Sequence, residues 1–302
     1  MDNLCHTLTG AALGEAGLKR LTRFANPVLM IASNLPDVDA LVFVTGMPSV
    51  EFRRGWTHGV LAQALLPVVL TAVVLAFARS RPARPTGPPA RAGALLALSY
   101  LGVLVHVAMD WLNNYGVRLL MPFSGRWFYG DAVFIIDPWL WLALGTGVFL
   151  ARRRGAVTSA RVALLLAGLY IGLMVWSAQA ARARVLAEWI AQRGSAPEAL
   201  MVGPAPVNPF RKIVIVDAGE RYENGTFRWF GERLTFDGPT VSTRERDAAV
   251  LRARDHPRIR SILVWARFPY YEVTPAAAST RVTISDMRFG PRVGSTSVIV
   301  PE

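Results

Sequence analysis

The stretch Val162–Ala181, with the sequence VALLLAGLYIGLMVWSAQAA, decides the fold class of this chain. It contains no charged residue and lies between Arg161 and Arg182. A helix of roughly 20 residues crosses about 30 Å, the thickness of the hydrocarbon core of a bilayer. The stretch therefore predicts a transmembrane helix.

Three earlier runs have the same character. Gly55–Ala78 and Ala92–Met109 hold no charged side chain, and Ala132–Ala151 holds only Asp137. With Val162–Ala181, these three runs predict four transmembrane helices. The alternative is a set of helices buried in a large soluble core, but these runs leave almost no polar face to meet water.

Two shorter apolar segments, Leu4–Leu18 and Pro27–Gly46, precede the four runs. The second is interrupted by Pro36, Asp37 and Asp39. Irregular backbone at membrane depth is tolerated where it is buried in protein. We therefore expect two half-crossing helices packed against an all-α membrane helical bundle.

The charges divide the 302 residues into two parts. Residues 1–180 hold 15 basic and 8 acidic residues, whereas residues 181–302 hold 18 and 13. The whole chain is 18% charged with a net charge of +12, against about 25% charged residues in typical soluble proteins. We expect a membrane-embedded domain over 1–181, a linker over 182–209 and a soluble domain over 210–302. Cys5 is the single cysteine, which excludes an internal disulfide.

The last part contains short β-like runs and two turn signals, Asn224-Gly225 and Asp237-Gly238. They predict a small α+β or mostly β domain. His256 is interpreted as a surface residue. The predicted strands are Ile213–Val216, Thr226–Phe230, Ile262–Phe268, Arg281–Ser285 and Ser297–Val300.

Two basic linkers, 79–91 and 152–161, contain no acidic residue and are predicted to face the cytoplasm. Arg182 and Arg184, at the other end of the last helix, count against this orientation. The cations form no obvious recognition helix for nucleic acid, and membrane lipid attracts the same charge. Membrane lipid is therefore the expected partner, and no nucleic acid is expected.

Ionisable residues are costly in a membrane domain and mark functional sites. His106 and Asp110 are four residues apart, on one face at the outward end of the predicted helix. Asp37, Asp39 and His58 lie at the ends of their segments, on the same predicted level. Singly, such a histidine is more often a hydrogen-bonded core residue and such an aspartate a helix cap. Their convergence favours a metal site.

His6, Asp131 and Asp137 are expected on the same level. Imidazole and carboxylate ligands suit a divalent metal, most of all zinc, with manganese and iron as alternatives. One or two ions are expected. The predicted ligands are His6, Asp37, Asp39, His58, His106, Asp110 and Asp137.

The leading hypothesis is metal-assisted hydrolysis of a phosphate ester. Asp39 or Asp131 would act as general base, and Arg54, Arg118 or Arg126 would hold the phosphate. Aromatic residues typical of membrane interfaces indicate an amphiphilic, phosphate-containing substrate. These residues are Trp56, Trp111, Trp127 and Tyr129.

The motifs resemble one known family over about residues 1–180: the YdjM/YbcI group of predicted bacterial inner-membrane-bound metal-dependent hydrolases. The resemblance implies a multi-pass protein of the bacterial inner membrane. With the two basic linkers in the cytoplasm, the site and the C-terminal domain are expected on the periplasmic face. It is carried by Asp2–Gly10, Asn34–Asp39, Arg54–His58, His106–Asp110, Gly125–Asp131 and Ile136–Pro138.

More distantly, the order of these residues is similar to the front of the zinc-dependent phospholipase C and nuclease superfamily. That likeness implies metal ligands at His6, Asp37 or Asp39, His58, His106 and Asp110, with Asp110 as a bridging ligand. The further histidine ligands of that superfamily have no counterpart here, since no histidine lies between His106 and His256.

Two other classes of function stay open. The buried Asp and His residues could form a transport or ion pathway. Alternatively, the chain could be a membrane scaffold with a structural metal site. The C-terminal domain is either a lid over the site or a module for an unknown protein partner.

Overall fold

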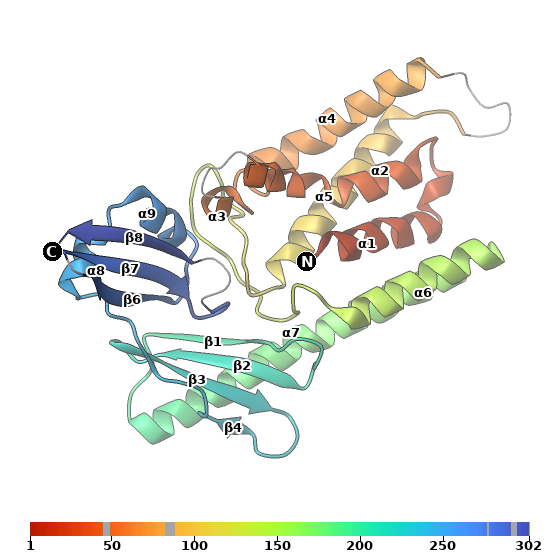
Figure 1. Ribbon diagram of the computed structural model, residues 1–302. Coiled ribbons are helices and arrows are strands. Elements are labelled where there is room, and N and C mark those ends of the chain that lie inside the picture. Colours follow the sequence, from red (N-terminus) through yellow and green to blue (C-terminus); the bar gives the residue numbers. More distant parts are fainter. Residues whose placement is uncertain (45–48, 82–87, 277, 291–294, 302) are drawn as a thin grey trace. The chain divides into compact units, whose positions relative to one another are not determined.

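A computed structural model describes residues 1–44, 49–81, 88–276, 278–290 and 295–301. The chain forms two compact units (Figure 1). The first comprises Met1–Ala40 and Arg53–Trp176, and the second Leu41–Phe52 and Ser177–Glu302. Part of the predicted linker 79–91 and the end of the predicted segment Pro27–Gly46 lie outside the described residues.

The first unit is helical. Its long elements are α1 (Asn3–Glu15), α2 (Ala25–Ala32), α4 (Val60–Arg79), α5 (Ala92–Trp111), α6 (Pro138–Arg154) and the first part of α7 (Val157–Arg193). Two 3₁₀ segments, η1 (Leu18–Arg20) and η2 (Leu35–Val44), flank α2, and η2 ends in the second unit.

Helix α2 packs closely against both α1 and α5. A Cβ on Gly10 of α1 would come within 2.7 Å of the Leu29 carbonyl oxygen. A Cβ on Gly102 of α5 would come within 2.5 Å of Ala32 Cβ. Small residues thus allow the backbones to approach, as they do between membrane helices.

Among the residues that the structure describes, three helices, α4, α5 and α7, are long and apolar enough to cross a membrane. A fourth crossing is possible at α2 and η2, which together pass the same test but are bent by 51°. This confirms a helical membrane domain with three to four candidate spans. The predicted third run, Ala132–Ala151, does not form a helix over its whole length. Helix α6 has 17 residues and begins at Pro138, because Asp137 caps it there.

The second unit contains two antiparallel sheets and short helices. The first sheet has the order β1 (Ala199–Pro204), β2 (Arg211–Asp217), β3 (Arg221–Arg228), β4 (Leu234–Thr235), and β5 (Val241–Ser242) also pairs with β3. The second has the order β6 (Pro269–Ala276), β7 (Ser279–Asp286), β8 (Thr296–Pro301). The short helices are α3 (Ser49–Phe52), α8 (Ala248–Ala253) and α9 (Pro257–Leu263).

The first sheet buries side chains on both faces, since Met201 and Ile215 pack with Phe268 and Tyr270 on the face away from α7. Val185 and Trp189 of α7 pack against Val214 and Phe227 of the first sheet. Helices α8 and α9 cover the second sheet through residues such as Ile259. The prediction of a β-rich C-terminal domain is therefore confirmed.

Several local predictions were wrong. Residues 182–209 do not form a linker, because α7 continues to Arg193 and ends at Gly194, where φ is +75°. β1 follows at once. Residues 262–268 do not form a strand, because His256 and Pro257 start helix α9. Asn224-Gly225 lies inside β3, where Gly225 lets the Thr235 carbonyl approach.

Candidate metal centre

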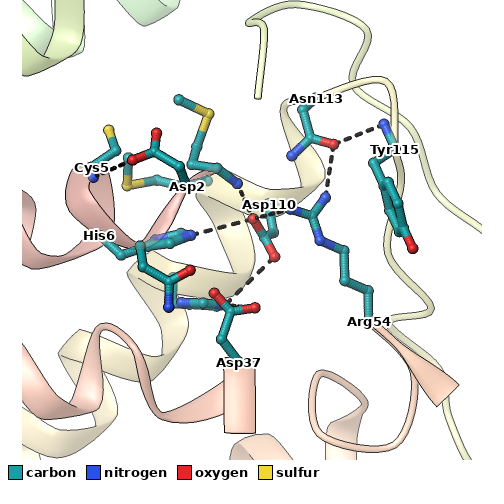
Figure 2. A network of polar contacts seen from close by, with 12 residues as sticks. Asp2, Cys5, His6, Asp37, Arg54, Asp110, Asn113 and Tyr115 are labelled. Atoms are coloured by element: carbon teal, nitrogen blue, oxygen red, sulfur yellow. Dashed lines mark hydrogen bonds and ion pairs between the residues drawn. The ribbon is translucent and has the colours of Figure 1, made fainter. Parts of the chain in front are cut away.

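Four side chains from three segments converge in the first unit. Asp37 comes from η2, His58 from the residues before α4, and His106 and Asp110 from α5. Figure 2 shows Asp37 and Asp110 of this group. All four are buried, and one possible ligand atom from each lies within 4.8 Å of the others. The spacing of four in α5 places its two ligands on one face, as predicted.

The distances between these atoms are short. His58 Nε2 lies 3.2 Å from His106 Nε2 and 3.2 Å from Asp110 Oδ2. His106 Nε2 lies 3.5 Å from Asp110 Oδ2 and 4.0 Å from Asp37 Oδ1. The donor or acceptor state of the two ring nitrogens therefore decides what this cluster can bind.

The other nitrogen of His106 settles its neutral tautomer. Nδ1 lies 2.7 Å from the carbonyl oxygen of Ser33, and a carbonyl only accepts hydrogen bonds. Nδ1 must therefore carry the proton. In the neutral ring, Nε2 then presents a lone pair to the cluster.

His58 is oriented in a similar way through Thr57. The Thr57 hydroxyl donates to Asp39 Oδ2 at 3.0 Å, so that its oxygen accepts from His58 Nδ1 at 2.9 Å. In the neutral ring of His58, Nε2 thus also presents a lone pair to the cluster. Such a support of ligating histidines by a second set of residues is usual in metal sites.

With both rings neutral and both carboxylates ionised, four hydrogen-bond acceptors face one another. Tetrahedral bonds of about 2.0–2.2 Å place ligand atoms roughly 3.3–3.6 Å apart, close to the separations here. Two imidazoles and two carboxylates are a donor set that zinc, manganese or iron accepts. The residues therefore fit a divalent metal ion.

Burial supports this use of the histidines. The loss of hydration lowers the pKa of His58 and holds that of His6 well below its usual value. Both rings are consequently neutral near pH 7, as metal ligands must be.

Arginines balance the carboxylates at the edge of the cluster. Arg53 Nη2 lies 3.3 Å from Asp37 Oδ1, and Arg53 Nε lies 3.5 Å from Asp39 Oδ1. Arg54 Nη2 lies 3.0 Å from Asp110 Oδ1. This oxygen is the one that does not face His58 and His106.

Arg54 also leads to Asn113. Its Nη1 donates to Asn113 Oδ1 at 2.9 Å, and its guanidinium lies over the Tyr115 ring at 4.7 Å (Figure 2). Asn113 is fully buried, and within the described structure its Nδ2 finds no hydrogen-bond acceptor. A buried amide without a partner costs free energy and calls for an explanation.

His6 lies beside the four-residue cluster. Its Nε2 is 3.3 Å from Asp110 Oδ1, and its ring stacks on His106 with 3.9 Å between the centroids. The Met1 amine contacts the same Asp110 oxygen. His6 thus approaches Asp110 from the side opposite to His58.

Asp39 and Asp137 have other roles than the predicted ligation. Asp39 Oδ2 accepts hydrogen bonds from the Arg54 amide at 2.8 Å and from the Thr57 hydroxyl. Through Thr57 it orients the ring of His58. Asp137 Oδ1 caps α6 by accepting two backbone amides, and its Oδ2 accepts from the Tyr170 hydroxyl at 2.8 Å. An aspartate before a proline at a helix start is a typical cap.

Asp131 and Arg126 are not among the converging groups of the described chain. Asp131 is half-buried in the loop before α6, with φ at +51°. The Arg126 guanidinium lies over Phe128 at 5.3 Å, and that of Arg118 over Trp127 at 5.1 Å. Their predicted roles in catalysis stay predictions.

Sequence reasoning missed three supporting groups: the Ser33 carbonyl, the Thr57 hydroxyl and the Asn113 amide. Thr57 stands next to His58 in a quoted motif, and Asn113 is three residues beyond Asp110. Neutral polar groups give no charge signal. Only their neighbours in sequence could have pointed to them.

Comparisons with known proteins concern the same part of the chain. No solved structure matches. The chain is 25% identical over 182 residues to YfhP of Bacillus subtilis (strain 168), a protein described as uncharacterized. The match covers 57% of this chain and 53% of YfhP, so the chain spans about half the length of this curated relative. The family model for the YdjM inner membrane protein matches residues 1–181, which include the spans and the four-residue cluster. The chain belongs to the YdjM inner membrane protein family.

Proposed function

We propose that this membrane protein is a metal-dependent hydrolase, and more narrowly a phosphoesterase acting on a phospholipid or a lipid-linked phosphate. The observation that carries the proposal is the meeting of four buried acceptors beside the donors of Arg54 and Asn113. The four acceptors alone would be enough to hold a structural metal ion. The Asn113 Nδ2 donor, which has no acceptor within the described structure, adds a place for an anion beside the Arg54 guanidinium.

Asp37, His58, His106 and Asp110 would hold the metal, and zinc is the ion that we propose. A second ion would have His6 and the Oδ1 oxygen of Asp110 as ligands. When bound, the metal would lower the pKa of a water molecule toward 7 and polarise a phosphoryl oxygen.

The neighbouring residues would bind and orient the phosphate group. Arg54 and Asn113 offer N–H donors to its anionic oxygens, and charge-assisted hydrogen bonds of this kind are strong. Asp39 and Thr57 would keep His58 in the ligating orientation. The proposed general base stays Asp39 or Asp131, and Asp39 is the one whose carboxylate lies beside His58.

Exposed aromatic residues next to the ligands support a lipid substrate. Trp111, which follows Asp110, is 39% exposed, and Trp56, two residues before His58, is 56% exposed. Tryptophan is enriched at membrane interfaces. A substrate with its head group in the site and its chains in the bilayer fits this setting. We place the site on the periplasmic face of the inner membrane.

The test uses the full-length protein in detergent or nanodiscs. Elemental analysis identifies the metal, and a panel of phosphomonoesters, phosphodiesters and lipid phosphates identifies the substrate. His106→Ala should lose both metal and turnover, whereas the matched control His256→Ala should keep both. Full turnover in His106→Ala and in Asp110→Ala would refute the proposal.

The alternatives give different outcomes. A transport pathway predicts metal movement across proteoliposomes with no hydrolysis of any ester in the panel. A structural ion predicts that chelation unfolds the helical unit, whereas removal of a catalytic ion mainly stops turnover.

A further inference from the structure

One end of the first sheet exposes a group of apolar side chains. Val207 is 60% exposed, Phe210 52% and Phe230 73%. The rings of Phe210 and Phe230 meet edge to face, 5.3 Å apart. The amide of Trp229 donates to the Phe210 carbonyl at 3.0 Å, which joins the two loops that carry them.

Two contacts show how this end lies along α7. Trp229 Nε1 donates to Ser177 Oγ at 2.8 Å, and Arg193 Nη2 contacts Glu223 Oε2 at 2.8 Å. Ser177 and Arg193 are about 24 Å apart along the helix, and Glu223 and Trp229 about 20 Å apart along the strand, at about 1.5 and 3.3 Å per residue. β3 therefore runs antiparallel to α7 (Figure 1). Its final residues lie nearest to Ser177.

Ser177 belongs to the apolar part of α7. The helix is a candidate span, and its uncharged run Val162–Ala181 ends at Arg182. That run is about as long as the hydrocarbon core is thick. Trp229 contacts α7 at Ser177, which precedes Arg182, the charged residue that ends the apolar run. The end of the sheet that carries Phe230 therefore lies level with the membrane boundary.

Basic residues lie next to the exposed rings in the sequence and in the strand register. Arg211 and Arg228 are opposite each other in the register of β2 and β3, and Arg228 bonds by its amide to the Arg233 carbonyl. The Arg184 guanidinium lies over the Trp229 ring at 4.6 Å. The turn 229–233 carries a single acid, Glu232. Aromatic residues with arginines are typical of contact with anionic lipid head groups.

We infer that this end of the sheet is a membrane-binding surface for anionic phospholipid, formed by Val207, Phe210 and Phe230 with Arg211 and Arg233. The rings enter the interfacial region of the bilayer, and the guanidinium groups bind lipid phosphates. Lipid is the occupant because α7 itself enters the bilayer at this level. The inference does not depend on the enzymatic proposal.

The test measures the depth of single labelled positions in the full chain. Cys5→Ala removes the native thiol, and Phe230→Cys then carries an environment-sensitive fluorophore. The matched control is Leu251→Cys on α8, where the native side chain is 54% exposed in the same unit. Both proteins are placed in vesicles of phosphatidylglycerol and phosphatidylcholine that contain brominated acyl chains.

We expect a blue shift and about threefold stronger quenching by brominated lipid at position 230 than at 251, because quenching requires contact with the bilayer. Equal, weak quenching at both positions would overturn the inference. A label at 230 that is shielded from aqueous iodide but not quenched by lipid would also overturn it, since a protein would then cover the surface.

A second experiment tests the role of the two arginines in binding anionic lipid. Arg211→Gln with Arg233→Gln, in the Phe230→Cys background, should reduce quenching in phosphatidylglycerol vesicles toward the level in pure phosphatidylcholine. Unchanged quenching, or no difference between the two lipids for the parent, would overturn the role of anionic lipid.

Discussion

Two buried aspartates, Asp110 in the helical unit and Asp286 in the β-rich unit, differ at one carboxylate oxygen. Asp110 Oδ1 is paired with Arg54 and the Met1 amine, so the difference lies at its Oδ2. Asp286 receives the amide of Arg267 at 2.7 Å and three donors of Arg288 at 2.8–3.0 Å. Asp110 Oδ2 instead faces the lone pairs of His58 and His106. A carboxylate whose two oxygens both accept hydrogen bonds is complete within the fold, whereas an oxygen that faces imidazole lone pairs leaves a place for a cation.

The largest expected effect tests that contrast at Asp110. Under the proposed function, Asp110→Ala should remove the metal and reduce turnover by about a thousandfold or more, because the proposed ion would lower the barrier to hydrolysis. Elemental analysis and the assay that identifies the substrate measure the two losses. Asp286→Asn is the control and should keep its metal. A variant of Asp110 with full metal content would remove the contrast.

The next effect concerns stability in the β-rich unit. Asp286→Ala leaves the Arg288 guanidinium buried without its partner, which should destabilise this unit by about 3–5 kcal/mol. Hydrogen exchange of amides in β6 and β7 measures the change. Metal content should be the same as in the native chain, and a loss of metal would show that the two sites are linked.

A smaller effect on metal affinity is expected from the two residues that orient His58. Asp39→Ala and Thr57→Val should weaken metal binding by about 10–100-fold, because the ring of His58 loses its support. Competition with a fluorescent chelator measures the affinity. Thr57→Ser keeps the hydroxyl and should restore binding, and equal affinities in Thr57→Val and Thr57→Ser would contradict the proposed support.

The smallest effect is expected at Asn113. Asn113→Ala removes one neutral donor to the substrate phosphate and should raise KM about tenfold with unchanged metal content. Steady-state kinetics and elemental analysis separate the two quantities. A parallel loss of metal would assign Asn113 to the support of the ligands instead.

Much of the fold was predictable because lipid exposure requires long runs without charge. α4, α5 and the first part of α7 follow such runs. The rest of α7 was not predictable from the same signal, because it leaves the membrane and packs one face against a sheet. At Pro257 the helix-start signal was in the sequence, but the apolar run Ile262–Phe268 favoured a strand.

The site divides along similar lines. Asp37, His58, His106 and Asp110 stood out because charge is rare in the first part of the chain. Asp137 stood out for the same reason, yet its position before Pro138 made it a cap. Rarity of charge selects candidates, but only spatial contacts distinguish a ligand from a helix cap.

The close approach of α2 and α5 at Gly102 has a consequence for the ion. A Cβ at Gly102 would lie 3.1 Å from the Ser33 amide nitrogen, as well as against Ala32. The Ser33 carbonyl fixes the proton on His106. A glycine without a functional group therefore helps to decide which ring nitrogen of His106 faces the cluster, so the affinity of the proposed ion would depend on how tightly the two helices pack.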